Sequence, residues 1–144
     1  MNKKWRMVQL IDILIVTHGQ FGSELLKSAE LITGKQKNVE TLSLNREDSI
    51  QQFGEIVREK IASFLSEDHQ LLVLTDLFGG SAANVSAANL KKMSFTCLTG
   101  VNLSMLLEAL ILRNNINDFG EFSQRIMESG INGIKNMAQV LMRK

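Results

Sequence analysis

The sequence contains no proline and a single cysteine, and neither sign of charge dominates. The absence of proline excludes collagen-like and proline-rich segments. Cys97 cannot form an internal disulfide, and one cysteine with two histidines cannot build a structural zinc site, so we expect no metal and no cofactor. The lone thiol is consistent with a reducing compartment.

Charge and hydropathy exclude two further classes of protein. Lysine and arginine total 16 against 15 acidic residues, which leaves no cationic excess for bulk binding to nucleic acid or to an anionic membrane. The apolar runs are far shorter than the roughly 20 residues of a membrane span. Lys3, Lys4 and Arg6 make the N-terminus basic, but Asp12 interrupts the apolar stretch that follows, which argues against a signal peptide.

The chain of 144 residues is long enough for one domain with one sizeable core, and its 44% apolar and 22% charged residues are ordinary for a globular protein. We expect residues 1–10 to be an N-terminal extension and residues 11–144 to form a single domain. Short apolar runs predict strands at 13–16, 39–44, 71–75 and 95–99. Helical spacing predicts helices at 21–32, 50–64, 81–92 and 103–114 and from near residue 122, with Asn45 and Asn102 as N-caps.

Strict alternation of strands and helices predicts right-handed βαβ units. The predicted fold is α/β, with a doubly wound, mainly parallel sheet of four to five strands and helices on both faces. Ligands of such sheets bind at the carboxyl ends of the strands. That rule directs attention to the residues that directly follow the predicted strands.

His18 and Asp76 each come directly after a buried strand. A carboxylate at Asp76 could accept the Nδ1–H of His18, fix the tautomer and leave Nε2 as a nucleophile. The alternatives are a hydrogen-bonded loop histidine and an aspartate that caps the loop or the next helix. His69 lies in a polar turn on the amino side of a strand and is interpreted as a surface residue, and Cys97 as a small buried hydrophobe.

Gly79-Gly80-Ser81 runs into a predicted helix, where exposed backbone N–H groups could cradle a phosphoryl group. Ser81 could cap that helix and donate its hydroxyl to an oxyanion; the alternative is a tight loop that ends in a capping serine. Histidine, aspartate and serine together also raise a hydrolase hypothesis. The sequence disfavours it because the glycine that would close a G-x-S-x-G elbow is absent.

Three segments together resemble the mannose-type enzyme IIA domains of the bacterial phosphoenolpyruvate:sugar phosphotransferase system (PTS). They are Ile15-Val16-Thr17-His18-Gly19, continued by residues 26–34; Leu74-Thr75-Asp76-Leu77-Phe78-Gly79-Gly80-Ser81-Ala82-Ala83-Asn84; and Gly100-Val101-Asn102-Leu103-Ser104 with the residues up to Glu108. The chain departs from the family at Ser104, where proline is common, and at Phe78, where tryptophan is frequent.

The resemblance implies a cytoplasmic phosphocarrier. His18 would accept a phosphoryl group from phospho-HPr and pass it to a cognate enzyme IIB, expected as a separate protein because the chain ends at Lys144. Asp76 would hydrogen-bond His18, while Thr17, Gly79, Gly80 and Ser81 would hold the phosphoryl oxygens.

The resemblance also concerns partners. Leu77 and Phe78 are expected to dock them, and contact with the membrane would be indirect, through the permease complex. The family further implies a homodimer with an exchanged antiparallel strand near residues 133–137. A regulatory module toggled by histidine phosphorylation, or a dihydroxyacetone-kinase-type phosphotransfer subunit, is the alternative.

Overall fold

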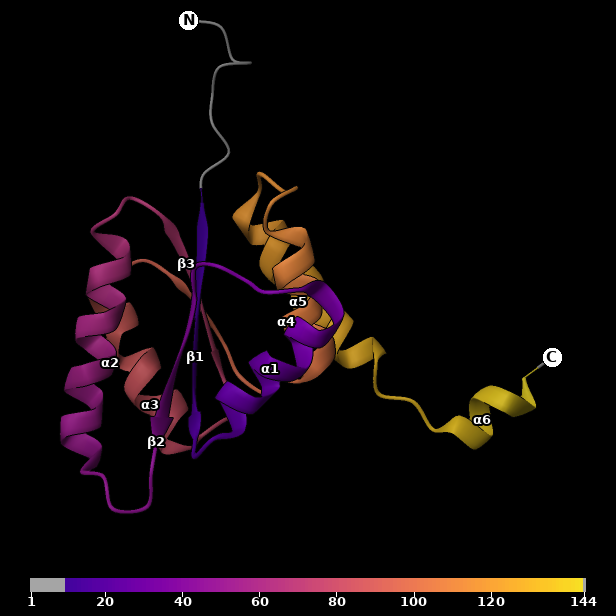
Figure 1. The fold of residues 1–144 in the computed structure, drawn as a ribbon, viewed down its shortest axis with the longest axis horizontal. Helices are drawn as coiled ribbons and strands as arrows, with labels where there is room; N and C mark the ends of the chain where they lie inside the picture. Colours follow the sequence, from indigo (N-terminus) through magenta and orange to yellow (C-terminus); the bar gives the residue numbers. More distant parts are fainter. Residues whose placement is uncertain (1–9, 144) are drawn as a thin grey trace, which may run out of the picture.

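The computed structural model describes residues 10–143, so most of the expected N-terminal extension lies outside the described residues. Four parallel strands form the sheet in the order β2-β1-β3-β4. The strands are β1 (Ile11–His18), β2 (Val39–Leu44), β3 (Gln70–Thr75) and β4 (Thr96–Leu98). Helices α2 (Ile50–Leu65) and α3 (Ser81–Ala87) lie on one side of the sheet, and α1 (Phe21–Thr33), α4 (Leu103–Leu112) and α5 (Phe119–Asn132) on the other (Figure 1). The predicted doubly wound α/β fold is confirmed, with four strands.

The central strands are apolar on both faces because both faces are covered by helices. Along β1, Ile13 and Ile15 contribute to the core under α1, α4 and α5, while Leu14 and Val16 contribute to the core under α2 and α3. All four side chains are completely buried. This alternation fixes the register of β1, and with it the position at which His18 leaves the sheet.

Helix α2 begins at Ile50, as the spacing predicts, but its N-cap differs from the predicted one. Its N-cap is Ser49, whose hydroxyl accepts the N–H of Gln52, and not Asn45. The Asn45 N–H instead donates to Asp48 Oδ2 at 2.7 Å, and the Asp48 N–H donates to the Asn45 carbonyl. These two bonds close a turn between β2 and α2. The prediction failed because Asn favours both caps and turns.

Two other helices have ends that differ from the predicted ones. The helix expected at 81–92 ends as an α-helix at Ala87 and continues as the 3-10 turn η2 (Ala88–Lys91). There the Asn89 amide donates to the carbonyls of Val85 and Ser86 and competes with the helical ladder. Helix α5 begins three residues earlier than expected because Asp118 caps it by accepting the N–H of Glu121.

The C-terminal segment does not form the strand that the resemblance implied near residues 133–137. Within the single chain described, Gly133 ends α5, residues 134–136 form a linker, and α6 (Met137–Met142) follows with no buried residue. Figure 1 shows α6 standing away from the rest of the fold. A strand at this position would need a pairing partner, and in the single chain described both edge strands, β2 and β4, are paired on one side only.

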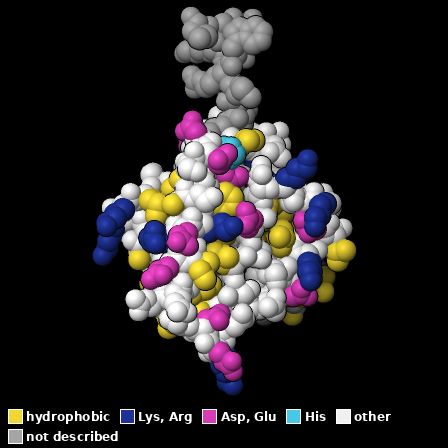
Figure 2. All heavy atoms as spheres, turned by 60° about the vertical axis from the view of Figure 1, so that its left-hand side comes forward, with side chains coloured by type: hydrophobic (Ala, Val, Ile, Leu, Met, Phe, Trp, Pro, Cys, Tyr) yellow, Lys and Arg dark blue, Asp and Glu magenta, His cyan; other side chains and the backbone are white. Residues whose placement is uncertain are grey.

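The face made by α2 and α3 carries basic and acidic side chains interspersed with apolar ones (Figure 2), in keeping with the near-neutral net charge. Among the described helices, none has the length and hydropathy that crossing a bilayer requires.

Candidate functional site

His18 and Asp76 meet at the carboxyl edge of the sheet, as predicted. Strands β1 and β3 are direct neighbours, with Val16 opposite Thr75, so Asp76 follows the end of β3 beside the last two residues of β1. Asp76 Oδ2 lies 2.9 Å from His18 Nδ1 and also accepts the His18 backbone N–H at 2.9 Å. Because a carboxylate can only accept, Nδ1 donates to Asp76, and in the neutral imidazole it is then Nε2 that keeps its lone pair.

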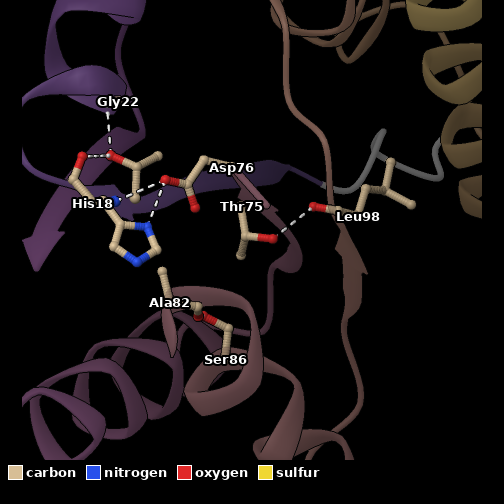
Figure 3. A network of polar contacts seen from close by, with 8 residues as sticks. His18, Gly22, Thr75, Asp76, Ala82, Ser86 and Leu98 are labelled. Carbon is tan, nitrogen blue, oxygen red and sulfur yellow. Dashed lines mark hydrogen bonds and ion pairs between the residues drawn. The ribbon is translucent and has the colours of Figure 1, made fainter. Parts of the chain in front are cut away.

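The orientation of the imidazole follows from this double contact. Figure 3 shows the second ring nitrogen turned away from Asp76, toward the start of α3. The His18 side chain is 49% exposed, whereas the Asp76 side chain is 13% exposed. The carboxylate is therefore an inner support, and the imidazole is the group that a partner can reach.

Asp76 experiences opposing influences on its pKa. Burial alone would raise the pKa of this carboxyl, but the backbone N–H of His18, the ring hydrogen bond and the charge of His18 together lower it below the usual 3.8. Asp76 Oδ1 is buried and has no hydrogen-bond donor among the described residues. The contacts at Oδ2 therefore hold the carboxylate in its charged form.

The glycine loop brings the start of α3 close to the ring. Gly79 has φ +81°, a conformation that other residues rarely adopt. At Gly80 an added Cβ would lie 3.2 Å from His18 Cε1 and 3.2 Å from the Leu77 carbonyl, so only glycine allows this close approach without a shift. Gly79 and Gly80 were predicted in the loop before this helix. The positive φ of Gly79 and the short distance from Gly80 to His18 explain why both positions need glycine.

Ser81 is the first residue of α3 and not its cap, which is Gly80. No side chain caps the helix, so the first backbone N–H groups have no intrahelical acceptor. The Ser81 hydroxyl has no hydrogen-bond partner within residues 10–143. Ser81 lines the same cleft as His18. Figure 3 shows the far side of the His18 ring facing Ala82, the second residue of α3.

Thr17 has a different role from the phosphoryl contact that the resemblance implied. It is completely buried. Its hydroxyl accepts the N–H of Gly22 at 2.9 Å and donates to the His18 carbonyl at 3.2 Å. With both bonds made inside the fold, Thr17 ties β1 to the start of α1 and supports the backbone of His18.

A cleft of about 410 Å³ opens beside His18. Gly19 and Ser81 line it next to His18, and the turn after β2 contributes Arg46 and Asp48. This turn follows β2 and was not among the predicted site segments, because the motifs in the sequence follow β1, β3 and β4. The pairing of His18 with Leu44 in the sheet is the feature that brings the turn to the site.

Leu77 and Phe78 border the site and are 59% and 86% exposed. Exposed large apolar side chains next to a reactive group are typical of a contact surface for another protein. They lie in the loop between Asp76 and the glycines, so a partner that covers them also approaches His18.

A second His–Asp pair lies at the opposite end of the sheet. His69 Nδ1 is 2.7 Å from Oδ2 of Asp12, whose side chain is 1% exposed. Arg113, also buried, donates to the carbonyls of Ile11, Lys37 and Asn38 and to Gln36. His69 is therefore a partner of a buried carboxylate and not the plain surface residue that the sequence suggested. Asp12 gave a signal in the sequence, a charged residue inside an apolar strand.

Comparison with known proteins places this chain in a family. The family model described as "PTS system fructose IIA component" matches residues 12–127. The PTS system mannose-specific EIIAB component of Escherichia coli strain K12 is 32% identical over 126 residues, which cover 87% of this chain and 39% of that protein. The PTS system fructose-specific EIIA component of Bacillus subtilis is 28% identical over 131 residues, which cover 90% of this chain and 83% of that protein.

Solved structures agree with this assignment. The phosphotransferase system component EIIA from Streptococcus agalactiae superimposes with a TM-score of 0.79 at 32% identity, covering 90% of this chain and 99% of that one. The PTS IIA protein associated with the fucose utilization operon of Streptococcus pneumoniae gives 0.81 at 29% identity, covering 94% and 99%. The chain therefore belongs to the family of EIIA components of the sugar phosphotransferase system.

Proposed function

We propose that this chain is a phosphocarrier that accepts a phosphoryl group on Nε2 of His18 from phospho-HPr and passes it to a cognate enzyme IIB during sugar uptake. The observation that carries the proposal is the pair of 2.9 Å contacts that Asp76 Oδ2 makes to His18. In the neutral ring they leave Nε2 as the nitrogen without a proton, on an exposed side chain whose far side faces the start of α3.

The chemistry is an in-line transfer between two nitrogen atoms. The Nε2 lone pair attacks phosphorus, a new P–N bond forms, and the P–N bond to the donor's phosphohistidine breaks as the donor imidazole leaves with its electron pair. His18 then carries positive charge on the ring, and the Asp76 carboxylate stabilises that charge through the Nδ1–H. In the second step the same bond breaks, and the phosphoryl group moves to the acceptor on enzyme IIB.

Positioning and electrostatic contacts account for the rest of the site. Ser81 and the amides next to Gly79 and Gly80 would contact the phosphoryl oxygens. Leu77 and Phe78 would form the apolar part of the surface to which HPr and enzyme IIB dock in turn. The phosphoryl exchange with HPr implies a cytoplasmic location.

A homodimer is also part of this proposal. The C-terminal segment exposes six large apolar side chains, which a second copy of the chain could cover. They are Ile131, Ile134, Met137, Val140, Leu141 and Met142. Sedimentation equilibrium tests this: Leu141→Glu should dissociate the dimer, and Leu31→Glu, an exposed leucine on α1, should not. A wild-type monomer at micromolar concentration would end this part of the proposal.

Intact mass spectrometry after incubation with phosphoenolpyruvate, enzyme I and HPr tests the carrier function. We expect one acid-labile phosphoryl adduct on the wild-type chain and on His69→Gln, and none on His18→Ala. An adduct that survives in His18→Ala would place the chemistry elsewhere. No adduct with HPr of the source organism would refute the assignment.

A second step separates a transport component from a regulatory module. Purified phospho-protein is mixed with candidate enzyme IIB proteins, and the loss of the adduct is followed by mass. Discharge within seconds supports the carrier function. A persistent adduct with every IIB protein of the organism would favour the regulatory alternative.

A further inference from the structure

We infer that Arg46 is a phosphoryl-binding residue of this chain, which supplies the positive charge that neutralises the group carried on His18. The inference rests on the proposed phosphorylation of His18 and assigns a role to the turn between β2 and α2. No sequence motif pointed to this turn.

The sheet register brings Arg46 to the site. Leu44 is the strand partner of His18, and the Gly19 N–H donates to the Leu44 carbonyl at 2.8 Å. Neighbouring strands lie about 4.8 Å apart, and two residues of chain span at most about 7 Å. The Cα of Arg46 therefore lies within about 12 Å of the Cα of His18, and its long side chain lines the same cleft as His18 and Ser81.

The charges around the cleft show why a cation is needed. Two carboxylates are already present, because Asp76 lies behind the imidazole and Asp48 lines the cleft. A phosphoryl group adds a further negative charge of about −1.5 to −2. Asp48 Oδ2 accepts the Asn45 N–H at 2.7 Å within the same turn. Arg46 is the cation among the residues that line this cleft.

The guanidinium of Arg46 is also free to act. It is exposed and forms no ion pair or hydrogen bond within the part of the chain that the structure describes. A planar guanidinium can donate two parallel hydrogen bonds to phosphoryl oxygens, which a lysine cannot.

The test uses the phosphorylated protein without any partner. The full chain is phosphorylated with phosphoramidate, a small phosphoryl donor, and the signal of phospho-His18 is assigned in ³¹P NMR by its loss in His18→Ala. The pH titration of that signal reports the second ionisation of the phosphoryl group. A nearby cation favours the dianion, so removing it in Arg46→Gln should raise the phosphoryl pKa by about half a unit.

Two variants and a salt series sharpen the result. Arg46→Lys keeps a positive charge at this position, so it should raise the phosphoryl pKa less than Arg46→Gln does. Arg58→Gln should titrate like the wild type, because Arg58 is an exposed arginine on α2 that lines a different groove. The difference between Arg46→Gln and the wild type should shrink as salt is raised.

Failure of this inference and failure of the proposed function give different results. If wild-type His18 takes up no phosphoryl group from phosphoramidate or from HPr, both are overturned. If it does, and Arg46→Gln titrates like the wild type, only the role of Arg46 is overturned. Slower transfer from HPr in Arg46→Gln with an unchanged titration would likewise overturn it and assign Arg46 to partner docking.

Discussion

Replacing Asp76 by asparagine separates the charge of this residue from its hydrogen bonds. Asp76 Oδ2 accepts from two donors, the backbone N–H and the Nδ1–H of His18. The asparagine oxygen must occupy that position, because an NH₂ group there would face two donors. The histidine therefore keeps its tautomer, and the NH₂ group takes the place of the buried Oδ1, for which the described residues offer no partner.

The magnitude follows from the kinds of hydrogen bond involved. A hydrogen bond to a charged group contributes about 1.5–3 kcal/mol and a neutral one about 1 kcal/mol. The loss on the phosphorylated form is thus about 0.5–2 kcal/mol, because only that form places positive charge on the ring. We expect the equilibrium constant for phosphoryl transfer from HPr to fall roughly two- to thirtyfold in Asp76→Asn.

The assay measures the distribution of phosphoryl groups between HPr and this protein by intact mass at equilibrium. Asp118→Asn is the matched control, since Asp118 caps α5 far along the chain and asparagine is an equally good cap. An unchanged constant would refute the claim that the carboxylate charge stabilises phospho-His18. A loss beyond a thousandfold would also refute it, because orientation would then not have been preserved.

Four further outcomes are expected. The pKa of Asp76 is lowered in the folded state, so its contribution to the unfolding free energy is present above pH 4 and lost as the pH falls through the lowered pKa. In urea unfolding between pH 2.5 and 6, the unfolding free energy of the wild type should therefore fall more steeply with acid than that of Asp76→Asn. Phe78→Ala should raise the KM for HPr about tenfold with an unchanged melting temperature, and equal kinetics would remove Phe78 from the docking surface. Gly22→Ala should lower the free energy of unfolding by about 1–3 kcal/mol, because the added Cβ would lie 2.9 Å from Ile15 Cγ2. In Gly54→Ala the added Cβ meets Val85 only at 3.6 Å, so this variant should be neutral or stabilising. Equal stabilities of the two variants in urea would contradict this. Arg113→Met should lower the free energy of unfolding by about 3 kcal/mol, because it leaves carbonyls that Arg113 binds without their donor. Phosphorylation of His18 should be unaffected. A change below about 1 kcal/mol in urea unfolding would argue against a stabilising role of Arg113.

The sequence predicted the features that are local or periodic. The strands and most helices follow from hydrophobic spacing, and the rule for parallel sheets brought His18 and Asp76 to one edge although 58 residues separate them. The rule works because it needs only the end of each strand and no detail of the chain between them.

The errors share a physical cause, which is competition between acceptors that only tertiary structure resolves. Ser81 could have capped its helix, but the approach of Gly80 to the imidazole made Gly80 the cap. Thr17 follows the pattern of a phosphoryl ligand, yet its hydroxyl is engaged by Gly22. Arg46 carries no local signal at all, because its position depends on which strand pairs with β1.

The strand order of the sheet has a consequence for how the protein becomes competent. His18 is synthesised before β3, but it becomes an oriented nucleophile only when β3 has docked beside β1 and carried Asp76 to it. Such pairing closes a long loop and is slow compared with helix formation. The phosphoryl adduct is therefore a chemical reporter of folding: a pulse of donor during refolding should label only molecules whose central sheet is complete.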